Sequence, residues 1–287
     1  MSKTTTKGRP VSEIDIEFEW QTSVVPLIDK QITLIQQDVR RAFDGHKVIV
    51  YLSCPISSRG GGYSGTNVDI ALHTERRLLE EWGERFWILN PCRYQMESGE
   101  GANLLQRHVG GTKIKRSDIK GGDYMRMWTR VLCEDAIVDR GKESQADLKN
   151  SGRCFDAFYF LGPSDVRDFF IRPGPQTLTA GVEEYFARRY ATDHEFMRFY
   201  SPKKQAEWES RRRAFFVFYA IRASANYSLG SHDEWNILRL LNRRRLAASQ
   251  KTGMLAGDVG EQIAGFFDGR QIDPAAFHLP ATQGYAM

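Results

Sequence analysis

The stretch VIVYLSCPISSRGGGYSGT, residues 48–66, decides the fold. Its first part, VIVYL, is too short for a helix and is rich in β-branched residues, which is typical of a strand buried on both faces. A polar loop follows, and glycine occupies four of the six positions from 60 to 65. We call residues 57–65 the glycine loop and ask what a loop of this kind, directly after a strand, would hold.

The residues on the C-terminal side complete a β, loop, α, β unit. Apolar residues recur at helical spacing from Thr66 to Trp82, and RFWILNP (85–91) follows as a second strand. FDAFYFLG (155–162) is the next clear strand, with a helix before it at about 123–139 and another after it from about Ala180. We therefore predict an α/β fold with a doubly wound, flavodoxin- or Rossmann-like parallel sheet, helices on both faces, and ligands at the carboxyl ends of the strands.

The flanking sequence suggests three parts. EIDIEFEW (13–20) alternates apolar and acidic residues, as a half-exposed edge strand does, and residues 22–43 have helical spacing with Pro26 in the first turn. Beyond residue 195, the segments 203–225, 232–248 and 257–269 look helical and contain no convincing strand. We predict an N-terminal tail, edge strand and helix (1–45), a nucleotide-binding α/β core (46–195), and a helical C-terminal extension (196–287) that packs on the core or forms an oligomer contact.

Composition favours a folded cytoplasmic protein. The first ten residues are polar, and no stretch reaches the roughly 18 to 20 apolar residues that a membrane span needs. Four cysteines occur without CxxC spacing, so we expect buried thiols rather than a zinc site or disulfides. Acidic residues lie close to the arginine runs at 211–213 and 243–245, which indicates solvated helix faces better than a nucleic-acid surface.

The glycine loop is the first candidate for chemistry. Glycines allow a ligand close to the backbone, the following helix N-terminus favours an anion, and Arg59 adds a positive charge. The spacing is neither GxGxxG nor GxxxxGK[ST], so neither dinucleotide binding nor phosphoryl transfer is indicated. A simple surface turn is the alternative.

Three carboxylates are further candidates. In TLTAGVEEYFARR (177–189), Thr177 and Thr179 can cap a helix whose first turn would contain Glu183, after a core strand. Asp135 falls within an apolar helical stripe, where a carboxylate is costly unless it is paired or lines a polar cavity. Asp147 precedes the strand at 155. Dipole stabilisation explains Glu183 equally well, and structural pairing explains Asp135.

The residues around the glycine loop resemble those of the nucleoside 2-deoxyribosyltransferase-like enzymes. YLSCPI (51–56) resembles the Tyr-x-x-Gly-Pro-like turn of that family, and Asn-Pro at 90–91 also fits. ISSRGG (56–61) is similar, with one extra residue, to the phosphate-wrapping Ile-Arg-Gly-Gly segment of the deoxynucleoside 5'-phosphate N-hydrolases. Thr177, Thr179, Glu183 and Ala187 occupy positions of the Ser-x-Gly-x-x-x-Glu-x-x-x-Ala nucleophile pattern, with threonines in place of the serine and glycine. The resemblance covers about residues 47–192.

This resemblance implies an N-glycosidase that cleaves the base–sugar bond of a nucleotide or nucleoside. Glu183 would be the nucleophile, Tyr51 would orient it, and Asp135 or Asp147 would assist. No metal or redox cofactor is needed. The residues expected to bind substrate are Ser53, Pro55, Ile56, Ser57, Arg59, Gly60, Gly61, Asn67, Trp128, Thr177, Thr179 and Gly181.

Three alternatives stay open. A 2-deoxyribosyltransferase would pass the sugar to a second base, and the sequence does not separate transfer from hydrolysis. Cytokinin-releasing phosphoribohydrolases carry a Pro-Gly-Gly-x-Gly-Thr loop, to which RPGPQTLTAG (172–181) is only loosely similar. A sensor with the same fold would bind a nucleotide without cleaving it.

Overall fold

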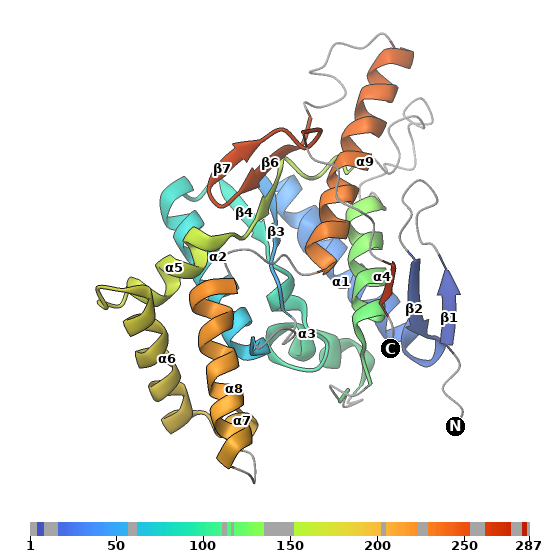
Figure 1. The fold of residues 1–287 in the computed structure, drawn as a ribbon. Coiled ribbons are helices and arrows are strands. Elements are labelled where there is room, and N and C mark those ends of the chain that lie inside the picture. The colour runs from blue at the N-terminus through green and yellow to red at the C-terminus, as the bar shows by residue number, and fades with distance from the viewer. Residues whose placement is uncertain are drawn as a thin grey trace.

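The backbone N–H and C=O groups of a buried strand need partners along both of its edges. Strand β3 (Val48–Ser53) has a neighbouring strand on each side. The computed structural model describes residues 5–8, 17–56, 62–110, 114–115, 118–134, 152–201, 205–222, 229–252, 262–276 and 283–285. In these residues the chain is α/β, with a five-stranded sheet of order β4-β3-β5-β6-β7 (Figure 1). The other four strands are β4 (Phe86–Leu89), β5 (Ala157–Phe160), β6 (Ala264–Phe267) and β7 (Arg270–Ile272). Only β7 runs antiparallel to its neighbour.

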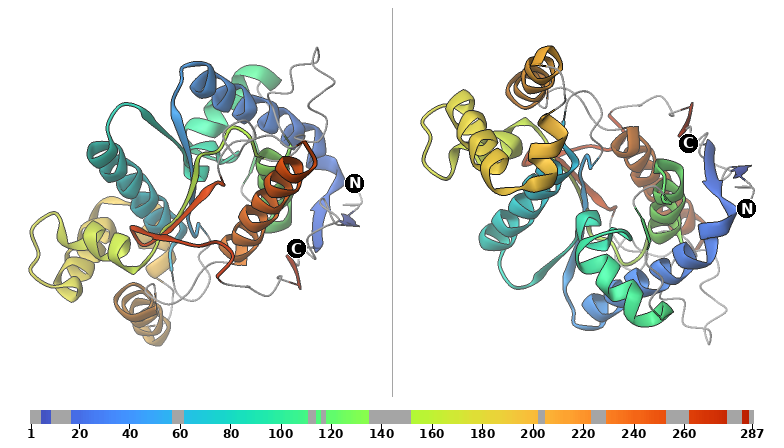
Figure 2. Two further views of the ribbon diagram at one scale, coloured as in Figure 1. Left: turned by 90° about the horizontal axis from the view of Figure 1, so that it is seen from above. Right: turned by 90° about the horizontal axis from the view of Figure 1, so that it is seen from below.

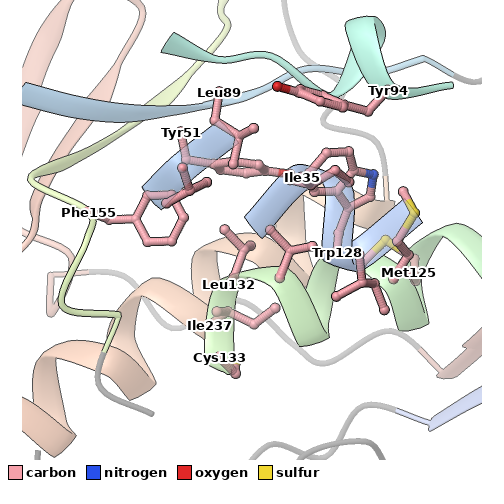
Figure 3. Packing of buried hydrophobic residues seen from close by; sticks show 14 of the residues in the cluster. Ile35, Tyr51, Leu89, Tyr94, Met125, Trp128, Leu132, Cys133, Phe155 and Ile237 are labelled. Atoms are coloured by element: carbon pink, nitrogen blue, oxygen red, sulfur yellow. The ribbon is translucent and has the colours of Figure 1, made fainter. Parts of the chain in front are cut away.

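Successive residues of β3 face two different cores, so helices cover both faces of the sheet. Tyr51 packs with α1 (Val25–Asp44), α4 (Gly121–Cys133) and α9 (Leu229–Thr252). Leu52 packs on the opposite face, with α2 (Ser64–Trp82). Figure 3 shows Tyr51, Trp128 and Ile237 from β3, α4 and α9 pointing into the first core. The predicted helix at 22–43, with Pro26 in its first turn, and the predicted β, loop, α, β order are confirmed.

The C-terminal extension is not wholly helical, and the predicted helix over 257–269 is wrong at residues 264–267. These residues form β6, which extends the sheet beside β5. Asn242 of α9 holds Ile263, the residue just before β6. The Ile263 N–H donates to Asn242 Oδ1 (2.8 Å), and Asn242 Nδ2 donates to Ile263 O (3.1 Å). Pairing with a distant strand overrides the local pattern here. Because α9 and Ile263 share a core with β3, the C-terminal part completes the sheet and its core.

The alternating segment near the N-terminus belongs to a second, smaller sheet. Strand β2 (Glu17–Gln21) pairs antiparallel with β1 (Thr5–Gly8) and parallel with β8 (Gln283–Tyr285). Strands from near both ends of the sequence therefore meet in one small sheet, with β1 and β8 on either side of β2 (Figure 2). The Asp123 carboxylate ties this sheet to α4 by accepting the Gln21 backbone N–H at 2.8 Å. The prediction of a strand is confirmed for 17–20, but the predicted edge position is wrong, because β2 is the central strand of this three-stranded sheet.

Most of the remaining helices gather in one place. At one side of the sheet, opposite α4 and α9, lie α5, α6, α7, α8 and the π-helix η5 (Figures 1 and 2). Their buried aromatic side chains form one cluster with the start of α2. The bounds are η1 (Thr22–Val24), η3 (Pro91–Tyr94), α3 (Gly99–Val109), α5 (Pro163–Ile171), α6 (Leu178–Thr192), α7 (His194–Tyr200), α8 (Gln205–Val217) and η5 (Phe218–Arg222). In the described part of the chain, no helix is both long and apolar enough to cross a membrane.

Candidate functional site

A buried carboxyl group lies at the carboxyl end of β3, and it comes from α9. The side chain of Glu234 is buried, and both of its oxygens accept hydrogen bonds from β3. Tyr51 Oη donates to Oε1 at 2.8 Å, and Ser53 Oγ donates to Oε2 at 2.5 Å. Residues 51 and 53 point to the same face because side chains alternate along a strand. One strand thus supplies both donors.

Burial controls the protonation of this cluster. It raises the pKa of Glu234 to about 7, although hydrogen bonds from Ser53 and Tyr51 pull the pKa down and Asp233 raises it further. Burial and the neighbouring Glu234 raise the pKa of Tyr51 well above its ordinary value, so Tyr51 stays a neutral donor. Glu234 can therefore exchange a proton near neutral pH, which suits an acid, a base or a nucleophile.

Two other buried carboxylates of the sheet region are paired with cations. Glu75 lies 2.8 Å from the guanidinium of Arg93, and Asp165 lies 2.5 Å from that of Arg77. Such pairs are typical of carboxylates that serve the fold. The hydrogen bonds described for Glu234 come from neutral hydroxyls, which compensate its charge less well. The hydrogen bonds described for the buried Asp123 also come from neutral groups, namely amides of Gln21 and Lys120, so it is the raised pKa of Glu234 and its position at the end of β3 that make it a candidate for chemistry.

The end of β4 lies beside this cluster. Asn90 caps η3, since its Oδ1 accepts the Cys92 N–H at 3.0 Å, and its Nδ2 donates to Glu75 at 2.7 Å. The Asn-Pro pair noted in the sequence therefore shapes the turn after β4. Cys92 in turn contacts Cys54, at the end of β3, with 3.6 Å between their sulfur atoms.

The C-terminal end of the glycine loop is held by η5. Tyr219 Oη accepts the Tyr63 N–H at 3.0 Å and donates to Asn67 Oδ1 at 2.7 Å. At Gly62 a Cβ atom would stand only 2.8 Å from the Phe218 ring. Asn67, predicted to bind substrate, is thus buried and bonded to Tyr219, so its described role is to anchor the start of α2.

The second predicted stretch lies on α6, in the aromatic cluster at the other side of the sheet. Thr177 caps α6 as expected, accepting the Ala180 N–H at 3.2 Å. Because the helix begins at Leu178, Glu183 lies in its second turn, and the prediction of a first-turn position is wrong. Glu183 and Thr179 are exposed. The Tyr51 hydroxyl, expected to orient Glu183, donates to Glu234 instead.

Gly181 of α6 serves packing between helices. A Cβ atom at this position would stand 2.2 Å from the carbonyl oxygen of Phe170 in α5. Glycine therefore allows a close backbone approach to α5, whereas the sequence predicts that Gly181 binds substrate.

The other predicted residues fall into two groups. Trp128 is buried in the core, with its ring centroid 5.9 Å from that of Tyr51, and Pro55 and Ile56 are half-buried just beyond β3. Binding of substrate by Trp128 stays a prediction. Asp135, Asp147, Ser57, Arg59, Gly60 and Gly61 lie outside the described residues.

Glu234 is not among the residues predicted from the sequence, although the sequence contains a signal for it. Ile237, Leu238 and Leu241 follow it by three, four and seven residues, which places a carboxylate on the apolar face of a helix. The same pattern singled out Asp135. The sequence assigns 232–248 to a C-terminal extension that packs on the core or forms an oligomer contact, and this choice stays open, so no carboxylate of the segment is singled out.

Comparison with known proteins does not identify the chain. It matches no protein-family model, no curated protein and no solved structure. In the described ranges, no three His, Cys, Asp or Glu side chains are grouped so that they could hold a metal ion. The geometry around Glu234 is therefore the best guide to function.

Proposed function

We propose that this protein is an N-glycosidase that cleaves the base–sugar bond of a nucleoside 5'-monophosphate, and that Glu234 rather than Glu183 is its nucleophile. The observation that carries the proposal is the buried carboxyl of Glu234, bonded by the hydroxyls of Tyr51 and Ser53 at the carboxyl end of a central strand. Burial and geometry favour it over Glu183, which is exposed on α6.

The position of the cluster in the sheet supports ligand binding there. The chain passes from β3 to β4 on one side and then to β5 on the other, so the order of strands reverses at β3. We interpret the sheet as doubly wound, with an order like that of flavodoxin, and in such sheets ligands bind outside the carboxyl ends at the point of reversal. Tyr51 and Ser53 stand at that point.

The chemistry follows from the charge that develops on the sugar. Cleavage leaves positive character on the anomeric carbon, and an ionised Glu234 would attack that carbon while the base departs with the bonding electrons. The hydroxyls of Tyr51 and Ser53 would hold the carboxylate in one orientation. Water would then cleave the glycosyl–enzyme ester and regenerate the carboxylate. With a pKa of about 7, Glu234 has both ionised and protonated forms available near neutral pH.

Two parts of the proposal rest on sequence. Protonation of the leaving base is assigned to Asp135 or Asp147, and the 5'-phosphate to the glycine loop with Arg59. The similarity of ISSRGG to a phosphate-binding segment supports the second assignment. A cytoplasmic location, suited to nucleotide metabolism, belongs to the same proposal.

A non-catalytic nucleotide sensor is the second candidate. It is favoured by the fact that both oxygens of Glu234 already accept hydrogen bonds, so the carboxyl could serve the fold alone. A sensor would bind a nucleotide and release it unchanged.

The deciding experiment measures free base by chromatography after incubating the pure protein with nucleosides, nucleoside monophosphates and NAD. We expect base release from a monophosphate, and a loss of at least about 100-fold in Glu234→Gln, because the amide cannot act as a nucleophile. Glu183→Gln is the matched control and should stay within about twofold of the wild type.

Each other outcome points to a different conclusion. Loss of activity in Glu183→Gln but not in Glu234→Gln would return the nucleophile to α6. Release that requires a second free base would make the protein a transferase. Binding without cleavage would favour the sensor.

A further inference from the structure

The proposed reaction makes no use of Cys54 and Cys92, which meet at the same edge of the sheet. Both thiols are free and buried, and their sulfur atoms lie 3.6 Å apart. The register of the strands explains the contact: Tyr51 pairs with Leu89, and the two cysteines follow these residues by three positions each. Cys54 directly follows β3 and Cys92 lies in η3, just after β4, so the two thiols meet where these neighbouring strands end.

We propose that Cys54 and Cys92 are a redox-sensitive pair that closes to a disulfide when the protein meets a peroxide, and so restrains the chain at the end of β3. One sulfur attacks a peroxide oxygen, which gives a sulfenic acid and the first water. The second sulfur then attacks the sulfenic sulfur, forms the S–S bond and releases the second water. The two thiols lose two protons and two electrons, and hydrogen peroxide is reduced to two waters.

The contact between the sulfur atoms is the observation that favours closure. Cys54 lies directly after β3 and Cys92 lies in η3, so each belongs to a short segment that follows a strand. The two sulfurs are already in contact, so closure needs a small local movement to reach the S–S bond length of about 2.05 Å.

The surroundings of the pair set its reactivity. The neighbouring Cys92 thiol and burial raise the pKa of Cys54 well above its ordinary value. The thiolate is the reactive form, so oxidation at neutral pH is slow and requires a sustained excess of peroxide. The reduced pair is thus the resting state.

Closure would act on the chain that borders the candidate site. Cys54 directly follows Ser53, whose hydroxyl bonds Glu234, and the described chain continues only to Ile56 before the glycine loop. A covalent link from Cys54 to the turn after β4 would fix this segment. The inference concerns the thiols themselves and stands whether or not the proposed reaction occurs.

The test treats the full chain with excess hydrogen peroxide, blocks free thiols by alkylation under denaturing conditions and maps tryptic peptides by mass spectrometry. Cys54 and Cys92 lie in separate tryptic peptides, 48–59 and 86–93. We expect these two peptides to be linked, with a loss of two hydrogens that dithiothreitol reverses. Hydrogen exchange at residues 51–56 should slow by about threefold or more in the oxidised protein.

Two variants control the test. Cys92→Ser should abolish the link, with Cys92→Ala as a second variant if the serine is poorly tolerated, whereas Cys133→Ser should leave it intact. Full alkylation of Cys54 and Cys92 after peroxide, oxidation to sulfinic acid without a link, or a link to Cys133 or Cys154 would each overturn the proposal. So would a link that leaves exchange at 51–56 unchanged.

Discussion

At the scale of the residue, Glu234 is a buried acid whose described donors are two hydroxyls. A hydroxyl donates one hydrogen bond but carries no charge, so it offsets only part of the cost of burying a carboxylate. The raised pKa of Glu234, about 7, follows from that imbalance. The same imbalance makes the residue useful for chemistry and costly for the fold.

This cost predicts how stability depends on pH. The folded pKa of Glu234 lies above its ordinary value of 4.5, so the protonated side chain favours folding below about pH 4.5 and this contribution is lost as the pH rises to about 7. In Glu234→Gln the free energy of unfolding should not fall in this way as the pH rises, because the amide stays neutral. We expect the variant to gain up to about 3 kcal/mol over the wild type between pH 4.5 and 8.

Urea denaturation at several pH values measures this gain. Glu183→Gln, on the exposed face of α6, is the control and should show no such trend. An equal difference between Glu234→Gln and the wild type at pH 5 and pH 8 would contradict the assignment of the raised pKa.

At the scale of the element, α6 is placed by its cap and by one glycine. Thr177 sets the first residue of the helix, and Gly181 lets its backbone approach α5. This contact turns the buried face of α6, with Val182 and Tyr185, toward the aromatic cluster and leaves Glu183 in solvent. Helix–helix packing thus decides which residues of the TLTAGVEEYFARR stretch are available to a ligand.

We expect Gly181→Ala to destabilise the protein by about 1 to 3 kcal/mol, since the added methyl group would overlap the Phe170 carbonyl. In an exposed helix the same change would stabilise by about 1 kcal/mol. Ala187→Gly is the control, at an exposed position of α6 where alanine is the better helix former, and it should lower the free energy of unfolding by about 1 kcal/mol. Thermal and urea denaturation measure both, and a more stable Gly181→Ala would show that α5 and α6 can separate at little cost.

At the scale of the whole molecule, the C-terminal part builds the centre of the protein. Strand β6 extends the sheet beside β5, and α9 covers one face and brings Glu234 to the end of β3. The two hydrogen bonds between Asn242 and Ile263 join α9 to the start of β6. Sheet and candidate site therefore depend on the same long-range contacts.

Removing the Asn242 side chain tests this dependence. Asn242→Ala leaves a buried N–H and C=O of Ile263 without their described partner, and we expect a loss of about 2 to 4 kcal/mol in the free energy of unfolding. Hydrogen exchange should also become faster in β6. Arg243→Ala, at the exposed neighbouring position, should change stability by less than about 0.5 kcal/mol. Equal effects of the two variants would show that the Asn242 bonds do not hold β6.

The local pattern of the sequence determined α1, β3, α2 and β4, because apolar periodicity, runs of β-branched residues and a first-turn proline act over a few residues. It also determined the cap at Thr177, and the family resemblance pointed to Tyr51 as a residue that holds a carboxylate. Only the tertiary structure decided that residues 264–267 form a strand and that the carboxylate beside Tyr51 is Glu234. The physical reason is distance along the chain: Tyr51 and Glu234 are 183 residues apart, and their contact exists only once α9 has docked on the sheet.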